Sequence, residues 1–179
     1  MRNRIMILAL VLLLGCVLPA CASDNNVVTE GSLLDENQPL VYQSIQTNTQ
    51  QELQQMEAVV ISSQKELQQY QSEQLQTYQL DFAPVDDSTG QSLPSFIEYV
   101  ERYQDDYFEQ QCLLIAVLQA PIDQPHYQVS DIVADGKNGG IVYVDQTEVA
   151  GSDAVSTWHM IMELDASFAD RDYTVVVNQ

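Results

Sequence analysis

Few side chains of this 179-residue chain have the types and spacings that carry chemistry. Its two histidines, His126 and His159, are far apart in the sequence, and neither has a second histidine at metal-binding spacing. The run Asp86-Asp87-Ser88-Thr89-Gly90 brings several oxygens together, as calcium requires, but it lacks the acid that closes a calcium loop. We interpret this run as an ordinary turn, and we predict no metal site and no cofactor.

Patterns typical of hydrolases are also incomplete. Gly151-Ser152-Asp153 is not the Gly-x-Ser-x-Gly elbow that presents a nucleophilic serine. Adjacent acids such as Asp105-Asp106 arise by chance in a chain with 26 acidic residues. The sequence therefore predicts a protein that is not an enzyme. The alternative left open is an envelope hydrolase or metal-dependent enzyme that joins distant acids with His126 or His159.

One cysteine near the start of the chain stands in an informative context. Arg2 and Arg4 precede an apolar stretch from Ile5 to Leu14, and Leu18-Pro19-Ala20-Cys21 is followed by small residues. A basic start, a short apolar run and a small-residue cleavage site make up a secretory signal. The apolar run is shorter than the ~20 residues needed to span a bilayer, which disfavours an uncleaved membrane anchor.

The residues Leu18-Pro19-Ala20-Cys21 resemble the lipobox of bacterial lipoproteins. The resemblance implies that Cys21 is joined to diacylglycerol, that the peptide before it is removed, and that the chain is held on the extracytoplasmic face of the cell membrane. Two acyl chains suit this role, because one chain anchors only marginally. Cys16 is a second candidate, but it would leave Val17 and Leu18 at the start of the mature chain. We therefore predict a lipoprotein signal peptide over residues 1–21.

The remaining chain is strongly acidic. Only four basic residues follow residue 21, against 26 acids, so the net charge there is −22: Lys65, Arg102, Lys137 and Arg171. A field of this sign repels phosphates, so we predict no nucleic-acid partner. The acids are scattered, which favours a solvated surface over a dedicated cation site. Cys112 lies in an apolar run and is predicted to be a buried, inert thiol.

Polar residues without periodicity over 22–38 predict a flexible tether, and residues 39–179 are long enough for a single domain. Two helices are expected after capping-box spacings, one at about 64–75 and one from Phe96 to near Asp105. The other segments with strand patterns predict an α+β domain, with two helices and one antiparallel sheet of six to seven strands. The predicted strands are 40–45, 58–61, 112–118, 127–134, 141–147, 158–164 and 173–177.

The clearest hairpin signal is Asp135-Gly136-Lys137-Asn138-Gly139-Gly140. We predict that the chain turns at Asn138-Gly139 or nearby, with positive φ there. The apolar phase slips between Val129 and Ile132 in the first arm, which predicts a β-bulge.

A later strand alternates large apolar and polar residues. Trp158, Met160, Met162 and Leu164 share one face, which predicts that this face packs against the two helices and forms the core. The same alternation predicts that His159 faces outward.

A second resemblance concerns the domain itself. Val59 to Leu67 is similar to the strand and Ser-x-x-Glu-Leu helix opening of the PrcB-type C-terminal domain, and the later strands follow in that family's order. Trp158 to Leu164 is similar to a segment of small clostridial lipoproteins. The resemblance implies a non-enzymatic surface lipoprotein, and in one branch a subunit that helps assemble a protease complex. We therefore expect a lipid-anchored binding or assembly module of the bacterial cell envelope. A purely structural envelope protein is a further alternative.

Overall fold

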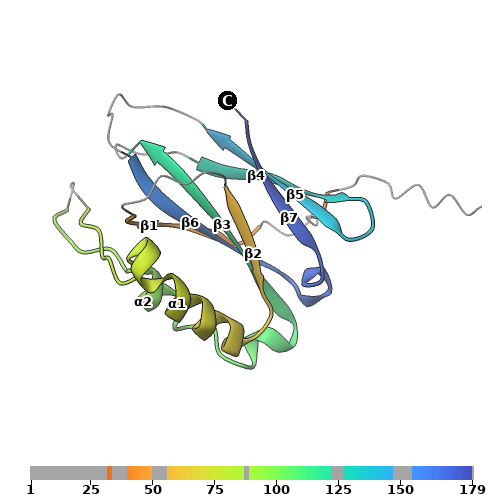
Figure 1. Cartoon of the computed structure of the whole chain (residues 1–179), viewed down its shortest axis with the longest axis horizontal. Helices are drawn as coiled ribbons and strands as arrows, with labels where there is room; N and C mark the ends of the chain where they lie inside the picture. Colours follow the sequence, from red (N-terminus) through yellow and green to blue (C-terminus); the bar gives the residue numbers. More distant parts are fainter. Residues whose placement is uncertain are drawn as a thin grey trace, which may run out of the picture.

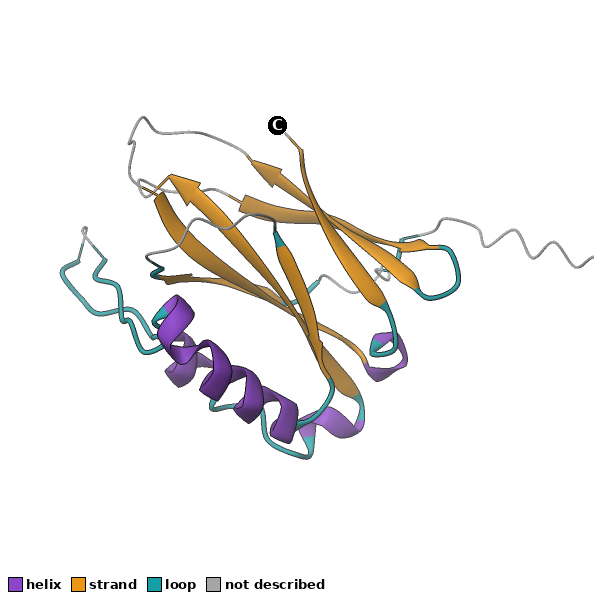
Figure 2. Ribbon diagram, in the orientation of Figure 1, coloured by secondary structure: helices purple, strands orange, loops and turns teal. Residues whose placement is uncertain are grey.

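Three layers make up the domain in the computed structural model, which describes residues 32–33, 40–49, 56–86, 89–121, 127–146 and 155–178. Two helices cover one face of a four-stranded sheet, and a three-stranded sheet covers its other face (Figure 1). Colouring by secondary structure separates the helical layer from the two sheets (Figure 2).

The central layer is an antiparallel sheet with the strand order β1-β6-β3-β2. Its strands are β1 (Tyr42–Thr47), β2 (Glu57–Ile61), β3 (Gln111–Pro121) and β6 (Val155–Asp165). All side chains from Cys112 to Leu118 on β3 are buried. This confirms the prediction that the unbroken apolar run is a strand covered on both faces.

The second sheet has the order β4-β5-β7. Its strands are β4 (Tyr127–Asp135), β5 (Gly139–Gln146) and β7 (Asp172–Asn178). The β4–β5 pair is antiparallel, whereas β5 and β7 are parallel. The prediction of one antiparallel sheet is therefore wrong in two respects: seven strands form two sheets, and one pair is parallel. Alternation shows which side of a strand is buried, but it does not show which strands pair.

The hairpin between β4 and β5 confirms two local predictions. The register shifts between Val129 and Asp131, so the predicted bulge is present. The turn also lies where it was predicted, near Asn138-Gly139, with its positive φ at Gly136 and with Asp135 paired with Gly139 across it. Gly139 is needed for another reason, because a β-carbon there would collide with the Asp135 carbonyl oxygen.

The first helix, α1 (Gln64–Tyr78), begins where the sequence predicts and extends three residues beyond the predicted end. The Ser63 side chain accepts a hydrogen bond from the Glu66 backbone N–H at 3.2 Å. The Glu66 carboxylate accepts from the backbone N–H of Ser62 at 2.7 Å. These bonds satisfy donors at the helix start that have no partner within the helix.

The second helix, α2 (Phe96–Val100), has the full predicted capping box between Ser95 and Glu98. It ends at Val100 rather than near Asp105, so its predicted length is wrong. The Tyr103 N–H bonds to the Val100 carbonyl in a turn, and Tyr103 is buried in the core. Short 3-10 turns follow at Tyr107–Glu109 and, after β6, at Ala166–Phe168.

The strand β6 contributes to both buried layers. Met160, Met162 and Leu164 pack against the second sheet, while His159 and Ile161 face the helices. The prediction that the methionine face packs on the helices is therefore wrong. The alternation is present, but it separates two buried layers instead of a buried face from a solvent face.

Two residues of the predicted tether contact the domain. Ser32 bridges to Val133, and the Leu33 N–H bonds to the Ile132 carbonyl oxygen at 2.6 Å, both on β4. Residues 1–21, which are the predicted signal peptide with both candidate cysteines, and His126 lie outside the described residues. In the part of the chain that is described, no helix is long and apolar enough to cross a membrane.

Candidate binding groove at the β1 edge

A hollow of about 320 Å³ runs beside β1, at one edge of the four-stranded sheet. We call it the β1 groove. Its lining is uncharged, with side chains from β1, the loop before α2, α2 itself and β6: Gln43, Ser44, Ile45, Gln46, Pro84, Leu93, Pro94, Tyr99 and Trp158.

The loop between α1 and α2 supplies one wall of the groove. A backbone bridge joins Val85 to Ser92, and the Leu93 N–H donates to the Pro84 carbonyl at 2.7 Å. The turn at its tip has positive φ at Gly90, whose N–H bonds to the Asp86 carbonyl at 2.7 Å. This supports the interpretation of the acidic run as a turn, although Asp87 and Ser88 lie outside the described residues. The bridge holds Pro84 and Leu93 together, with Leu93 46% exposed.

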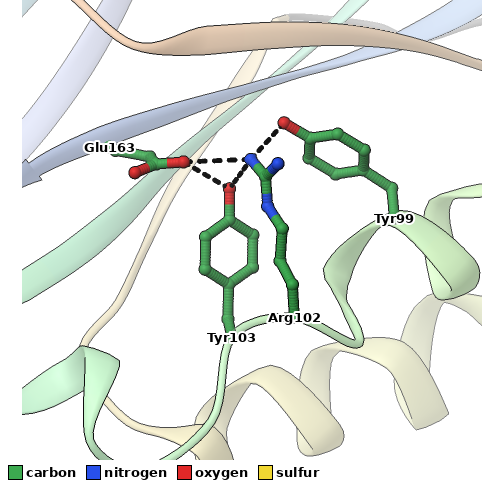
Figure 3. Close-up of polar contacts among 4 residues, drawn as sticks. All are labelled: Tyr99, Arg102, Tyr103 and Glu163. Atoms are coloured by element: carbon green, nitrogen blue, oxygen red, sulfur yellow. Dashed lines mark hydrogen bonds and ion pairs between the residues drawn. The ribbon is translucent and has the colours of Figure 1, made fainter.

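Tyr99 forms another part of the wall and is held by a polar cluster (Figure 3). The Arg102 guanidinium carbon lies 4.1 Å from the Tyr99 ring centroid and 4.7 Å from that of Tyr103. Arg102 Nη2 and the Tyr103 hydroxyl both donate to Glu163 Oε1, at 3.0 and 2.8 Å. Arg102 Nη2 also contacts the Tyr99 hydroxyl.

The cluster raises the pKa of Arg102, which is charged at physiological pH in any case. Partial burial alone would lower its pKa, but the hydrogen bond with Tyr103 and the charge of Glu163 raise it. The Arg102 side chain is 49% exposed, so its ion pair with Glu163 contributes little to stability. Its effect is to fix the orientation of Tyr99 at the groove.

The backbone of β1 presents hydrogen-bonding groups to the groove. The Val41 carbonyl accepts a hydrogen bond from the Glu163 N–H at 3.0 Å. This bond shows which residues of β1 form hydrogen-bonded pairs with β6. Bonding alternates along an antiparallel strand, so Gln43 and Ile45 bond to β6 while Tyr42 and Ser44 point their backbone groups away. The Gln43 side-chain amide donates to the Ser44 carbonyl at 3.1 Å. Within the described ranges, no strand pairs with this edge of β1.

Trp158 borders the groove and is only partly buried. It lies opposite Gln46 in the β1–β6 register. Its Nε1–H is buried and has no acceptor among the residues that the structure describes. The predicted role of Trp158 in a core beneath the helices is therefore wrong, because its side chain shares the face of Met160 and Met162, away from the helices, and is only partly buried.

His159, unlike Trp158, lies in the interior of the domain. Its side chain is fully buried, so the prediction that it faces outward is wrong. Nδ1 lies 3.0 Å from the Thr47 hydroxyl, and Nε2 lies 3.0 Å from the Tyr70 hydroxyl. Tyr78 and Phe96 pack edge-on, with ring centroids about 5 Å from the imidazole. Burial lowers the pKa of His159 to about 3, so the ring is neutral at physiological pH.

The remaining sequence-predicted residues fall outside the groove. Cys112 is fully buried, as predicted, and donates to the Asp165 carbonyl at 3.5 Å. Burial raises the pKa of its thiol to about 11. Asp106 caps the 3-10 turn before β3. In the described part of the chain, no three His, Cys or acidic side chains are grouped to hold a metal.

Sequence reasoning missed the groove residues because nothing local marks them. Pro84, Leu93 and Pro94 fall in a predicted loop, and Tyr99 falls within the predicted helix from Phe96 to near Asp105, where no spacing marks it. No family model, curated protein or solved structure matches this chain.

Proposed function

We propose that the protein is a non-catalytic binding or assembly module, anchored by lipid on the extracytoplasmic face of a bacterial cell membrane. The observation that carries the binding role is the β1 groove. Its uncharged lining combines aromatic and apolar side chains with backbone groups on a strand edge. Concave apolar surfaces with a few placed polar groups are the usual form of binding sites.

The position of His159 speaks against the enzyme alternative. A general base must reach its substrate, directly or through one water. His159 has no exposed surface, and each of its ring nitrogens already has a hydroxyl partner. An enzyme would need His126, which lies outside the described residues, or acidic residues alone.

The anchor is tested by metabolic labelling with a palmitate analogue. Cys21→Ser is expected to abolish acyl labelling and leave the signal peptide uncleaved, whereas Cys16→Ser is expected to keep both labelling and cleavage. Labelling that persists in Cys21→Ser and disappears in Cys16→Ser would move the anchor to Cys16. Labelling unchanged in both variants would remove the lipoprotein proposal.

The binding role is tested by crosslinking in intact cells. A photoreactive amino acid at position 93 is expected to give a specific adduct, because Leu93 is exposed at the groove. The matched control is position 176, where Val176 is also exposed but lies on β7 of the second sheet. Equal adducts at both positions, or none at position 93, would contradict a binding role for the groove.

A further inference from the structure

We propose that the β1 groove binds an extended segment of a partner protein as an additional strand on β1, and that this segment is apolar at alternate positions and carries basic residues. The inference rests on the proposed binding function and names the class of its partner.

Within the described ranges, the edge of β1 lacks the features that protect the β4 edge from pairing. Proteins block exposed edges with charged residues, proline, bulges or a covering segment. The β1 sequence Tyr-Gln-Ser-Ile-Gln-Thr has no charge and no proline, and its register with β6 is continuous. By contrast, the β4 edge of the other sheet carries a bulge and is met by Ser32 and Leu33.

An incoming strand would find hydrogen-bonding groups in place. The phase of the β1–β6 ladder directs the backbone groups of Tyr42 and Ser44 toward the groove. The Gln43 amide that bonds the Ser44 carbonyl belongs to a side chain that lines the same groove. A backbone N–H from the added strand would replace this amide. Main-chain bonds of this kind give the affinity of strand addition, while pockets for alternate side chains give the specificity.

The groove can receive side chains on both sides of an added strand. Residues of that strand opposite Gln43 and Ile45 would point toward the helical layer, where Leu93 and Tyr99 lie. The intervening residues would point toward the other side of the sheet, which is the side of Trp158. Apolar residues at period two therefore match the wall beside the helices.

Charge selects basic segments among possible extended partners. The chain after residue 21 has a net charge of −22, whereas the groove lining itself is uncharged. Long-range attraction therefore acts on charges that flank the bound segment, while the bound residues enter an apolar hollow. The same field disfavours nucleic acid and anionic lipid as occupants.

The first test selects a peptide and then probes its backbone. Random peptides of about ten residues, flanked by lysines, are enriched on the full acylated chain in detergent. We expect enriched sequences with apolar residues at every second position. N-methylation of one alternating set of peptide nitrogens is expected to weaken binding at least about tenfold, and of the other set less than about twofold.

The second test changes the backbone of the β1 edge. Ser44→Pro removes an N–H that points away from β6, and proline is tolerated on edge strands. It is expected to weaken peptide binding about tenfold without changing the far-ultraviolet circular dichroism spectrum. Ser44→Ala keeps the N–H and serves as the matched control, with binding expected within about twofold.

Several outcomes would overturn the inference and leave the proposed function standing. Equal tolerance of both N-methylated sets, or unchanged binding by Ser44→Pro, would mean that the groove does not add a strand. Failure to enrich any peptide, or equal binding after the flanking lysines are replaced by glutamates, would remove the basic peptide as partner. If position 93 still crosslinks specifically in cells, only this inference fails; if it does not, the proposed function fails as well.

Discussion

The two faces of the four-stranded sheet are both buried, yet they use different side chains. The face under the helices holds aromatic rings around His159, whose two ring nitrogens lie within hydrogen-bond distance of the Thr47 and Tyr70 hydroxyls. The face toward the second sheet is aliphatic and methionine-rich, with Leu114, Met160 and Met162. The difference shows that packing on the helix side depends on the direction of hydrogen bonds. Packing on the side of the second sheet depends on the volume of the side chains. A buried polar group requires its partners, whereas an aliphatic layer tolerates substitutions that conserve volume.

The largest effect is expected from Phe96→Ala. Phe96 is fully buried, and its ring lies 5.0 Å from the imidazole of His159. The variant should lose ~3–5 kcal/mol of unfolding free energy, measured by chemical denaturation, because the truncated side chain leaves a cavity beside His159. Leu93→Ala on the exposed loop is the control and should change stability by less than about 0.5 kcal/mol. A loss below ~1 kcal/mol in Phe96→Ala would mean that the aromatic layer is not tightly packed.

The next effect depends on pH and isolates the histidine. Burial lowers the pKa of His159 from 6.5 to about 3. Between pH ~6.5 and pH ~3, the unfolded chain therefore binds a proton at His159 that the folded chain does not bind. The contribution of His159 to the free energy of unfolding is complete above pH ~6.5 and is lost as the pH falls toward 3. The loss is expected to reach about 2–3 kcal/mol by pH ~4.5.

Because many carboxylates titrate in the same range, the measured quantity is a difference. Urea unfolding of the natural chain and of His159→Gln is compared at both pH values. The stability difference between them should shrink or reverse at the lower pH. Parallel curves for the two proteins would show that His159 is protonated or exposed in the folded state.

A smaller loss of unfolding free energy is expected from Tyr70→Phe, which removes one hydroxyl without changing the packing of the ring. The Nε2 atom of His159 then has no partner, at a cost of ~1–3 kcal/mol. Tyr42→Phe is the matched control on the other side of the sheet, where no described residue bonds the hydroxyl; its effect should stay below ~0.5 kcal/mol. Equal losses of unfolding free energy in both variants would show that the hydrogen bond between Tyr70 and His159 does not stabilise the helix-side layer.

The smallest effect is expected in the aliphatic layer. Met162 is fully buried against the second sheet, and Met162→Leu nearly conserves its volume. The loss should be below ~1.5 kcal/mol, measured by the shift of the denaturation midpoint at constant slope. A larger loss than that of Tyr70→Phe would show that this layer is as sharply specified as the aromatic one.

Local chemistry explains which parts of the fold were predictable. The capping boxes, the β4 bulge and the buried run of β3 depend on neighbouring residues, and the structure confirms them. The end of α2 depends on Tyr103 docking into the core, which no spacing records. The division into two sheets depends on pairing between distant strands. The alternation on β6 predicts a strand, as the structure has it, but it does not indicate that both faces of this strand are buried.

The candidate site was less predictable than the fold. The histidine reads as a surface residue because its partners come from β1 and α1, more than 80 residues away along the chain. Tyr99 and Leu93 meet beside β1 only because a backbone bridge closes the loop before α2. The sequence predicts instead the signal and the acylated cysteine, because these are read from a contiguous stretch.

The position of β6 between β1 and β3 has a consequence for the order of folding. Thr47 pairs with Thr157, so β1 acquires its partner only after nearly the whole chain has been made. Closing a loop of this length costs entropy before any contact rewards it, and sheets built from distant strands fold slowly. The strand nearest the start of the domain is thus among the last to dock. Among the described strands, β6 is the one partner of β1, so β1 has no strand to pair with until β6 has been made.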